Sequence, residues 1–214
     1  MKKIAIYGAG GLGREMGLLI AQINEHFLEW DLIGYFDDHI DAETRVKNLK
    51  VIGGIMELNK FNEELNLIVA IADSNVRSTI IDSVNNSKIV YPSLIHPSTI
   101  MEDKEVDLGE GSVITAGNIL TTDIKVGDHC IINLGCTIGH DVELGDYCSV
   151  MPGVHLSGNV KVSSHVLIGT GARILQNLTI ADYATIGAGA VVTKGILEGE
   201  TVVGVPARNI SKDA

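Results

Sequence analysis

The chain has 214 residues, enough for one large domain or two small ones. Hydrophobic residues make up 45% and charged residues 20%, proportions typical of a folded globular protein rather than a disordered one. A net charge of −11 repels the phosphates of nucleic acids and anionic lipids, so neither is expected as a partner.

The N-terminal sequence predicts neither an export signal nor a membrane anchor. The strand-like run from Ile4 to Tyr7 is too short for the core of a signal peptide. No run approaches the roughly 18 apolar residues of a membrane span. We therefore expect a cytoplasmic protein without membrane insertion. In that reducing compartment, an odd count of three cysteines argues against a disulfide framework.

Strand-like and helix-like segments alternate over residues 1–94. Buried apolar runs predict strands at residues 3–7, 32–36, 67–71 and 89–91. Apolar residues at helical spacing predict helices near residues 12–23, 55–61 and 76–84. Asp73 or Ser74 can cap the last of these helices. This alternation indicates a parallel sheet with packed helices, and its size predicts an α/β half-Rossmann-like domain.

The segment Gly8-Ala9-Gly10-Gly11-Leu12-Gly13 satisfies G-x-G-x-x-G between the first strand and the first helix. Asp37 and Asp38 end the next strand. In such an arrangement a helix N-terminus holds phosphate and an acid binds ribose. An NAD-dependent oxidoreductase fits this motif, but a half-domain suits a single nucleotide, such as that of an activated sugar. Alternatively, the glycines serve only a tight turn and close helix packing.

After residues 95–98, which we interpret as a linker, the hydrophobic period becomes six. Fifteen positions six residues apart all carry Leu, Ile or Val, from Leu108 to Val192 without an insertion. Six residues form one short strand and a bend, and three such units close one triangular coil. The fifteen units therefore predict five coils of a parallel β-helix within residues 95–214.

The register of the repeat assigns roles to glycines and cysteines. Glycine often follows the aliphatic residue, as at Gly139 and Gly145, and we attribute this to unusual φ angles at the bends. Cys130, Cys136 and Cys148 all lie four residues after an aliphatic position. This position faces inward, so we expect the thiols to pack in the core and not to act as nucleophiles or metal ligands.

The tripeptide Gly139-His140-Asp141 falls at a bend of the predicted coil. An imidazole has an ordinary pKa near 6.5, which suits proton removal at neutral pH, and a neighbouring carboxylate can orient it. His140 is therefore the candidate general base and Asp141 its candidate supporting acid.

The whole chain resembles the bacterial sugar acetyltransferases, on the strength of the Gly-rich α/β domain, the hexapeptide repeats and the Gly-His-Asp motif. That family includes nucleotide-amino-sugar N-acetyltransferases and proteins named as sialic acid O-acetyltransferases. The resemblance implies a left-handed parallel β-helix, which has the shape of a three-sided prism, and a homotrimer. It also implies acetyl-CoA as the acyl donor, held between the prisms of neighbouring subunits. It implies no metal.

The resemblance also carries over individual site residues. The catalytic pair falls on His140 and Asp141. The substrate contacts fall on Gly11, Leu12, Gly13, Asp37, Asp38, Ala72 and Asn133. The coenzyme contacts fall on Ser149, Thr170 and Ala188. The segment from Val203 to Arg208 resembles the C-terminal tail that caps the last coil in hexapeptide acyltransferases.

These inferences predict an acetyltransferase that modifies the amino group of a nucleotide-linked amino sugar in surface-polysaccharide biosynthesis. Some N-acetyltransferase relatives carry Glu-His-Glu where this chain has Gly139-His140-Asp141. An O-acetyltransferase acting on a hydroxyl of a sialic-acid-like sugar is therefore an alternative, and a non-catalytic β-helix is another. Hexapeptide repeats also form zinc-dependent carbonic anhydrases with three histidine ligands. A resemblance to that family would place zinc on His129 and His165, two coils apart, but Thr170 stands where that family's pattern has its third histidine.

Overall fold

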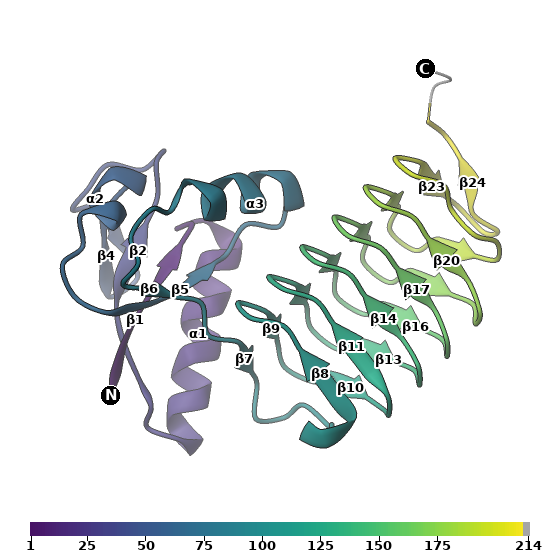
Figure 1. Cartoon of the computed structure of the whole chain (residues 1–214), viewed down its shortest axis with the longest axis horizontal. Helices are drawn as coiled ribbons and strands as arrows, with labels where there is room; N and C mark the ends of the chain where they lie inside the picture. The colour runs from purple at the N-terminus through teal and green to yellow at the C-terminus, as the bar shows by residue number, and fades with distance from the viewer. Residues whose placement is uncertain (212–214) are drawn as a thin grey trace. The chain divides into compact units, whose positions relative to one another are not determined.

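The computed structural model describes residues 1–211 and divides the chain into two compact units, Met1–Pro92 and Ser93–Ala214 (Figure 1). The sequence places this boundary two residues later. Strand β7 (Leu94–Ile95) pairs in parallel with β9 (Val113–Ile114). Ile95 is thus part of the second unit, and its assignment to a linker is wrong. Within the described residues, no helix is both long and apolar enough to cross a membrane.

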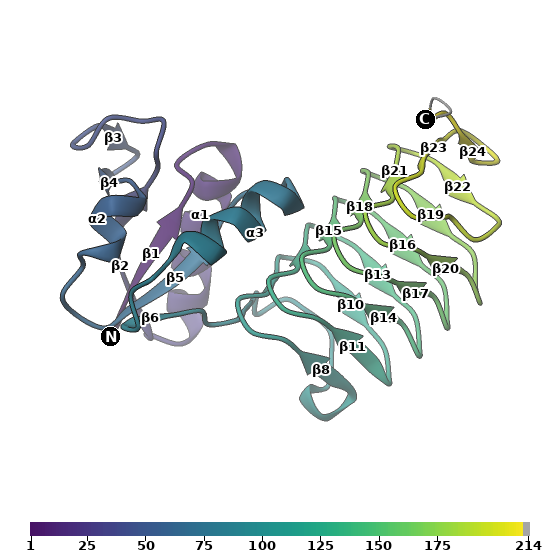
Figure 2. The same ribbon diagram turned by 45° about the horizontal axis from the view of Figure 1, so that its top comes forward.

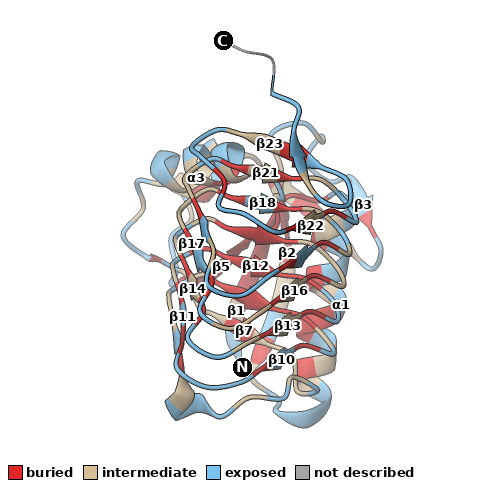
Figure 3. Cartoon of the chain, turned by 90° about the vertical axis from the view of Figure 1, so that its right-hand side faces the viewer, coloured by how far each residue is buried: buried red, intermediate tan, exposed pale blue. Residues whose placement is uncertain are grey.

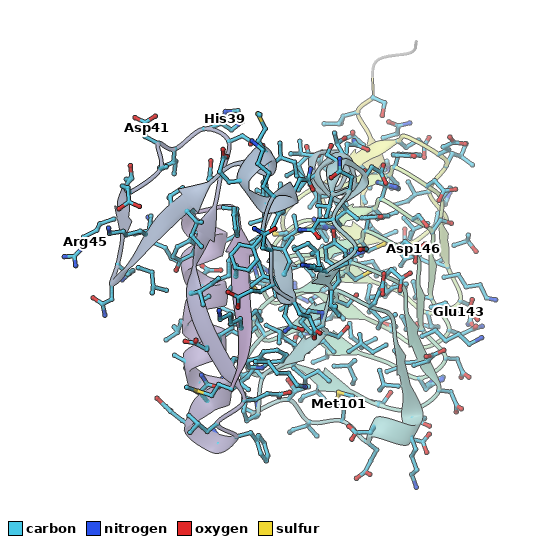
Figure 4. The ribbon with its side chains drawn as sticks, turned by 60° about the vertical axis from the view of Figure 1, so that its left-hand side comes forward. His39, Asp41, Arg45, Met101, Glu143 and Asp146 are labelled. Carbon is cyan, nitrogen blue, oxygen red and sulfur yellow. The ribbon has the colours of Figure 1, made fainter. Side chains whose placement is uncertain are left out.

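The first unit contains a six-stranded sheet in the order β3-β4-β2-β1-β5-β6. Its strands are β1 (Lys2–Tyr7), β2 (Trp30–Phe36), β3 (Arg45–Val46), β4 (Leu49–Gly53), β5 (Leu65–Val69) and β6 (Ile89–Val90). All pair in parallel except β3, which forms an antiparallel edge hairpin with β4. The predicted parallel sheet is confirmed. The hairpin was not predicted, because so short an edge strand has no readable period; its exposed Arg45 is labelled in Figure 4.

Helices cover both faces of this sheet (Figure 2). Helix α1 (Gly11–His26) packs its apolar stripe of Met16, Leu19 and Ile20 on one face. Helices α2 (Ile55–Asn59) and α3 (Ser74–Ser83) belong to a cluster with Tyr7 and Leu67 on the other face. The predicted cap of α3 is confirmed, because the Asp73 carboxylate accepts hydrogen bonds from two N–H groups of the first turn.

The second unit is a three-sided parallel β-helix, and each face is named here by one of its strands. The β12 face contains β9 (Val113–Ile114), β12 (Ile131–Ile132), β15 (Ser149–Val150), β18 (Leu167–Ile168) and β21 (Thr185–Ile186). The β13 face contains β10 (Ile119–Leu120), β13 (Thr137–Ile138), β16 (His155–Leu156), β19 (Arg173–Ile174) and β22 (Val191–Val192). The β14 face contains β8 (Val106–Leu108), β11 (Ile124–Val126), β14 (Glu143–Leu144), β17 (Lys161–Val162) and β20 (Thr179–Ile180).

Each strand pairs with the strand three repeat units further along the chain, as Ile132 does with Val150 and Ile138 with Leu156. The predicted coil of three units is therefore confirmed. The aliphatic positions from Ile114 to Val192 are at most 4% exposed, and only Leu108 is partly buried. In Figure 3 the inward strands are accordingly red and most turns are tan or pale blue. Each buried aliphatic side chain contributes about 1.5–3 kcal/mol relative to an exposed one.

The three cysteines also lie inside the prism. Cys130, Cys136 and Cys148 are each 0% exposed and form no disulfide. The inward position that the repeat assigns to them is confirmed. Burial raises the pKa of the Cys136 thiol above its usual value, because a thiolate loses its solvation in an apolar interior.

The glycines that follow the aliphatic residue, such as Gly139 and Gly145, do not have left-handed φ angles, so the predicted reason for them is wrong. Left-handed backbone occurs two residues later, as at Asp141 (φ 59°) and Asn159 (φ 54°). A Cβ on Gly139 would instead lie 2.8 Å from the backbone nitrogen of Gly158 in the next coil. Glycine is needed at Gly139 because the coils approach closely there, and not because of an unusual φ.

The repeat changes at both ends of the prism. A 3-10 turn at Asp103–Glu105 lengthens the first coil. The first coil, measured from Ile95 to its partner Ile114, therefore contains one residue more than each later coil. At the other end, β23 (Thr201–Val203) pairs with β21 and is covered by the antiparallel strand β24 (Arg208–Asn209). The tail thus closes the last coil.

Candidate active site

His140 projects from the corner that joins β13 to β14. Its Nδ1 atom lies 2.7 Å from Oδ2 of Asp141, and the two side chains are 65% and 57% exposed. Because an ionised carboxylate only accepts hydrogen bonds, Nδ1 carries the proton and Nε2 is left as the basic nitrogen. The corner itself is fixed by backbone bonds from Asp141 N–H to the Thr122 carbonyl and from Asn159 N–H to the His140 carbonyl.

A groove of about 590 Å³ opens beside this pair. It is lined by Asp123, Lys125, His140, Asp141, Glu143, Asn159, Lys161 and Asn177. On its β14 face, Glu143 lies between two lysines, with its carboxylate oxygens 3.8 Å from Lys125 Nζ and 3.7 Å from Lys161 Nζ. Figure 4 labels Glu143 on this outer surface. A polar, charged groove next to a basic imidazole suits a hydrophilic acceptor.

Lys125, Glu143 and Lys161 were not predicted from the sequence. They stand at the outward position before the aliphatic residue in three successive coils, where each pairs with the next. Writing the sequence with one coil to a row would have aligned them in one column.

The two histidines considered as zinc ligands occupy the corner between the β14 and β12 faces. There His129, Tyr147, His165 and Tyr183 form a column of stacked rings with centroid separations of 5.4, 4.9 and 4.8 Å. Tyr147 therefore lies between the two imidazoles. Among the described residues, no group of three or more His, Cys, Asp or Glu side chains is arranged to hold a metal ion.

The Gly-rich loop of the first unit joins β1 to α1. Gly8 has a left-handed φ of 101°, and a Cβ on Gly13 would collide with the Gly8 carbonyl. Helix α1 begins at Gly11 without a side-chain cap and without acidic residues in its first turn. Its first N–H groups are thus in a place that favours an anion.

Both predicted acids lie next to this loop. Asp37 accepts hydrogen bonds from the backbone N–H groups of Ala9 (2.9 Å) and His39 (2.8 Å). Asp38 accepts one from the N–H of Ile55 at 2.8 Å and another from the Tyr7 hydroxyl. Each carboxylate oxygen retains acceptor capacity for a further donor, such as a ribose hydroxyl.

The environment of Tyr7 and the loop after β5 complete this end of the sheet. Burial, with the adjoining Asp38 carboxylate, raises the pKa of the Tyr7 hydroxyl well above its usual range. Ala72 is exposed in the loop after β5, and its carbonyl accepts a hydrogen bond from the buried Arg77 guanidinium at 3.2 Å. Gly11, Leu12 and Gly13 thus form the first turn of α1, whereas Asp37, Asp38 and Ala72 belong to loops, and all six lie at the carboxyl end of the sheet.

Known proteins resemble both units. A family model described as the PglD N-terminal domain matches residues 3–84. The acetyltransferase domain of PglB from Neisseria gonorrhoeae FA1090 is 30% identical, with a TM-score of 0.89 over 98% of this chain and 100% of that one. The chain belongs to the hexapeptide-repeat family of bacterial sugar acetyltransferases. No curated protein matches it significantly.

Two further solved structures agree with this assignment. WeeI from Acinetobacter baumannii AYE is 30% identical, with a TM-score of 0.88, covering 98% of this chain and 100% of that one. A mutant of perosamine N-acetyltransferase from Caulobacter crescentus, solved with CoA and GDP-perosamine, is 28% identical, with a TM-score of 0.87 over 99% of this chain and 98% of that one. The prism of this acetyltransferase is accordingly a left-handed parallel β-helix, and the enzyme is an acetyl-CoA-dependent acyltransferase.

The coenzyme residues expected from the resemblance occupy two environments in this acetyltransferase. Thr170 and Ala188 are exposed and stack in successive coils on the corner between the β12 and β13 faces. Gly171 and Gly189 follow them with left-handed φ, and no atom lies within 4 Å of where their Cβ would be. A long, thin ligand could lie against this bare corner. Ser149, by contrast, is 0% exposed in β15.

Asn133 lies at that same corner and not in the His140 groove. It is only 6% exposed, and its side-chain oxygen accepts a hydrogen bond from the N–H of Leu134 at 2.8 Å. Within one chain, the structure therefore brings His140 and Asp141 together but places Asn133 elsewhere. Its role as a substrate contact stays a prediction.

Proposed function

We propose that this enzyme transfers the acetyl group of acetyl-CoA to the amino group of a nucleotide-linked amino sugar, in surface-polysaccharide biosynthesis. The observation that carries the proposal is the 2.7 Å contact between His140 Nδ1 and Asp141, beside a polar groove. It is supported by the relative from C. crescentus, an N-acetyltransferase that was solved with CoA and GDP-perosamine.

In the proposed reaction His140 acts as the general base. Its Nε2 atom takes a proton from the acceptor amine as the amine nitrogen attacks the thioester carbonyl carbon. The bond from carbon to sulfur then breaks, and the imidazolium returns the proton to the leaving thiolate. Asp141 holds the Nδ1 proton and stabilises the imidazolium. Such assistance typically contributes about 10² to 10⁴-fold in rate.

The charges of the groove favour an amine over a hydroxyl acceptor. Asp123, Asp141 and Glu143 contribute three carboxylates, whereas Lys125 and Lys161 contribute two ammonium groups. This small excess of negative charge attracts the amino group of the sugar, whose protonated form is cationic. The uncapped start of α1, in the first unit, would hold the phosphates of the nucleotide.

We further propose that the enzyme is a cytoplasmic homotrimer. His140 is 65% exposed, so its groove lacks an outer wall in a single chain. A neighbouring prism would supply that wall. The coenzyme would then be enclosed between the two prisms, along the corner that carries Thr170 and Ala188. Light scattering at working concentration should give three times the chain mass, and a monomeric mass would contradict this part of the proposal.

The decisive experiment is a panel of acceptors assayed by release of free CoA thiol. UDP-, GDP- and dTDP-linked amino sugars form one arm and sialic acid forms the other, with a His140→Ala variant as the control. We expect release with at least one nucleotide amino sugar and none above background in the control. Release with sialic acid alone would replace the amine by a hydroxyl acceptor, and no release with any sugar would oppose the proposal.

A further inference from the structure

The imidazole of His140 lies directly against Gly158, the residue at the equivalent position of the next coil. A Cβ placed on Gly158 would approach Cε1 to 2.5 Å and Cδ2 to 2.9 Å, and would come closer still to Nε2. Real Cβ atoms essentially never approach another heavy atom within 3.0 Å. The ring therefore occupies the space that a side chain at position 158 would need.

The backbone does not require glycine at this position. Gly158 is absent from the residues with left-handed φ, which at this corner are Asp123, Asp141, Asn159 and Asn177. Another residue would thus find a permitted conformation at position 158. The requirement for glycine comes from the imidazole ring of His140, which packs against this position.

The corner between the β14 and β12 faces shows where side chains at the equivalent position go. There Asp146 accepts a hydrogen bond from the N–H of Asp128 at 2.9 Å, and Ser164 accepts one from the N–H of Asp146 at 3.2 Å. Each side chain reaches back toward the preceding coil. At the His140 corner the same direction leads into the imidazole, and Gly158 leaves this space to the ring.

We propose that Gly158 is a positioning residue for His140, an inference that rests on the proposed role of His140 as the base. The imidazole is anchored at Nδ1 by Asp141 and has Gly158 beneath its Nε2 edge. Because the ring is largely exposed, a methyl group at position 158 displaces the ring toward solvent and leaves the coil intact. Displacement moves Nε2 away from the acceptor and weakens the bond to Asp141.

Kinetics of Gly158→Ala, His140→Ala and the double variant test this proposal. Gln176→Ala is the control, since Gln176 is the exposed residue of the same column one coil further on. We expect Gly158→Ala to lower kcat roughly 10- to 100-fold, as a displacement of about 1 Å at a reacting group can. The KM for acetyl-CoA and the melting temperature should stay at wild-type values, and Gln176→Ala should behave as wild type.

The double variant separates an effect through His140 from an independent one. We expect it to be no slower than His140→Ala alone, because the ring that Gly158 positions is then absent. A further drop of the same size, a raised KM for acetyl-CoA, or wild-type kcat in Gly158→Ala would overturn the proposal.

A spectroscopic measurement keeps this inference distinct from the proposed function. The imidazole ¹H–¹³C signals of His140 can be assigned by their loss in His140→Ala. They should shift in Gly158→Ala and stay in place in Gln176→Ala, whatever the activity. Wild-type turnover in His140→Ala would end the general-base proposal, whereas unmoved His140 signals in Gly158→Ala would end the positioning proposal.

Discussion

Nδ1 of His140 and Oδ2 of Asp141 lie 2.7 Å apart at one corner of the β-helix, although they are neighbours in sequence. Asp141 adopts the left-handed conformation that asparagine and aspartate tolerate better than most residues. The same residue therefore both turns the chain and holds the imidazole.

Replacing His140 by alanine should lower the rate of acetyl transfer about 10² to 10⁴-fold, because the acceptor would lose its base. The affinity for acetyl-CoA should persist, since backbone hydrogen bonds at Asp141 and Asn159 hold the corner in place without the imidazole. Turnover is measured by thiol release and binding by calorimetry. Wild-type turnover would refute the assignment.

Replacing Asp141 by asparagine keeps the left-handed turn but removes the charge. We expect kcat to fall roughly 10- to 100-fold, corresponding to the loss of a charge-assisted hydrogen bond of about 1.5–3 kcal/mol. Asp103→Asn, in the exposed 3-10 turn, is the matched control and should retain full activity. Equal rates for the two variants would show that the carboxylate does not support the base.

Two acids of one coil should differ in their effect on stability. Asp146 accepts a hydrogen bond from the backbone of the preceding coil, whereas Glu143 makes only two long, exposed ion pairs; both are labelled in Figure 4. Asp146→Ala should lower the free energy of unfolding by about 0.5–1.5 kcal/mol. Glu143→Ala should change the free energy of unfolding by less than about 0.5 kcal/mol. Urea denaturation of the two variants and the wild type measures both changes.

The three cysteines should resist thiol reagents in the folded protein. Each is 0% exposed, and the raised pKa of Cys136 further reduces its thiolate fraction at neutral pH. Titration with a chromogenic disulfide should find no rapidly reacting thiol before urea is added and three afterwards. A fast-reacting thiol in the native enzyme would place one cysteine outside the core.

Tyr7 should make the protein sensitive to alkali. Its pKa is raised in the folded state above the unfolded value near 10, by burial and by Asp38. The stability that this difference gives is complete below pH 10 and is lost as the pH rises further, because the unfolded chain then ionises preferentially. Tyr7→Phe removes this group, so its unfolding free energy should fall less steeply above pH 10.

The first unit could be predicted only in part. Strands β1, β2 and β5 and helices α1 and α3 each carry a readable apolar period, and the structure has them within a few residues of the expected ranges. The hairpin of β3 and β4 was missed, since its edge strand is too short to show a period. The close approach that requires glycine at Gly13 involves the carbonyl of Gly8 and is visible only in space.

In the second unit the six-residue period by itself determined the coil, the buried core, the inward cysteines and the corner that carries His140. A strict period fixes which side chains face inward, because each coil repeats the geometry of the one before. Only the tertiary structure decided which residues of successive coils contact one another. It placed Lys125, Glu143 and Lys161 in one groove, left Asn133 on a different corner, and set the imidazole of His140 over Gly158. These contacts join residues of successive coils, and their distances depend on a stacking that a linear pattern does not measure.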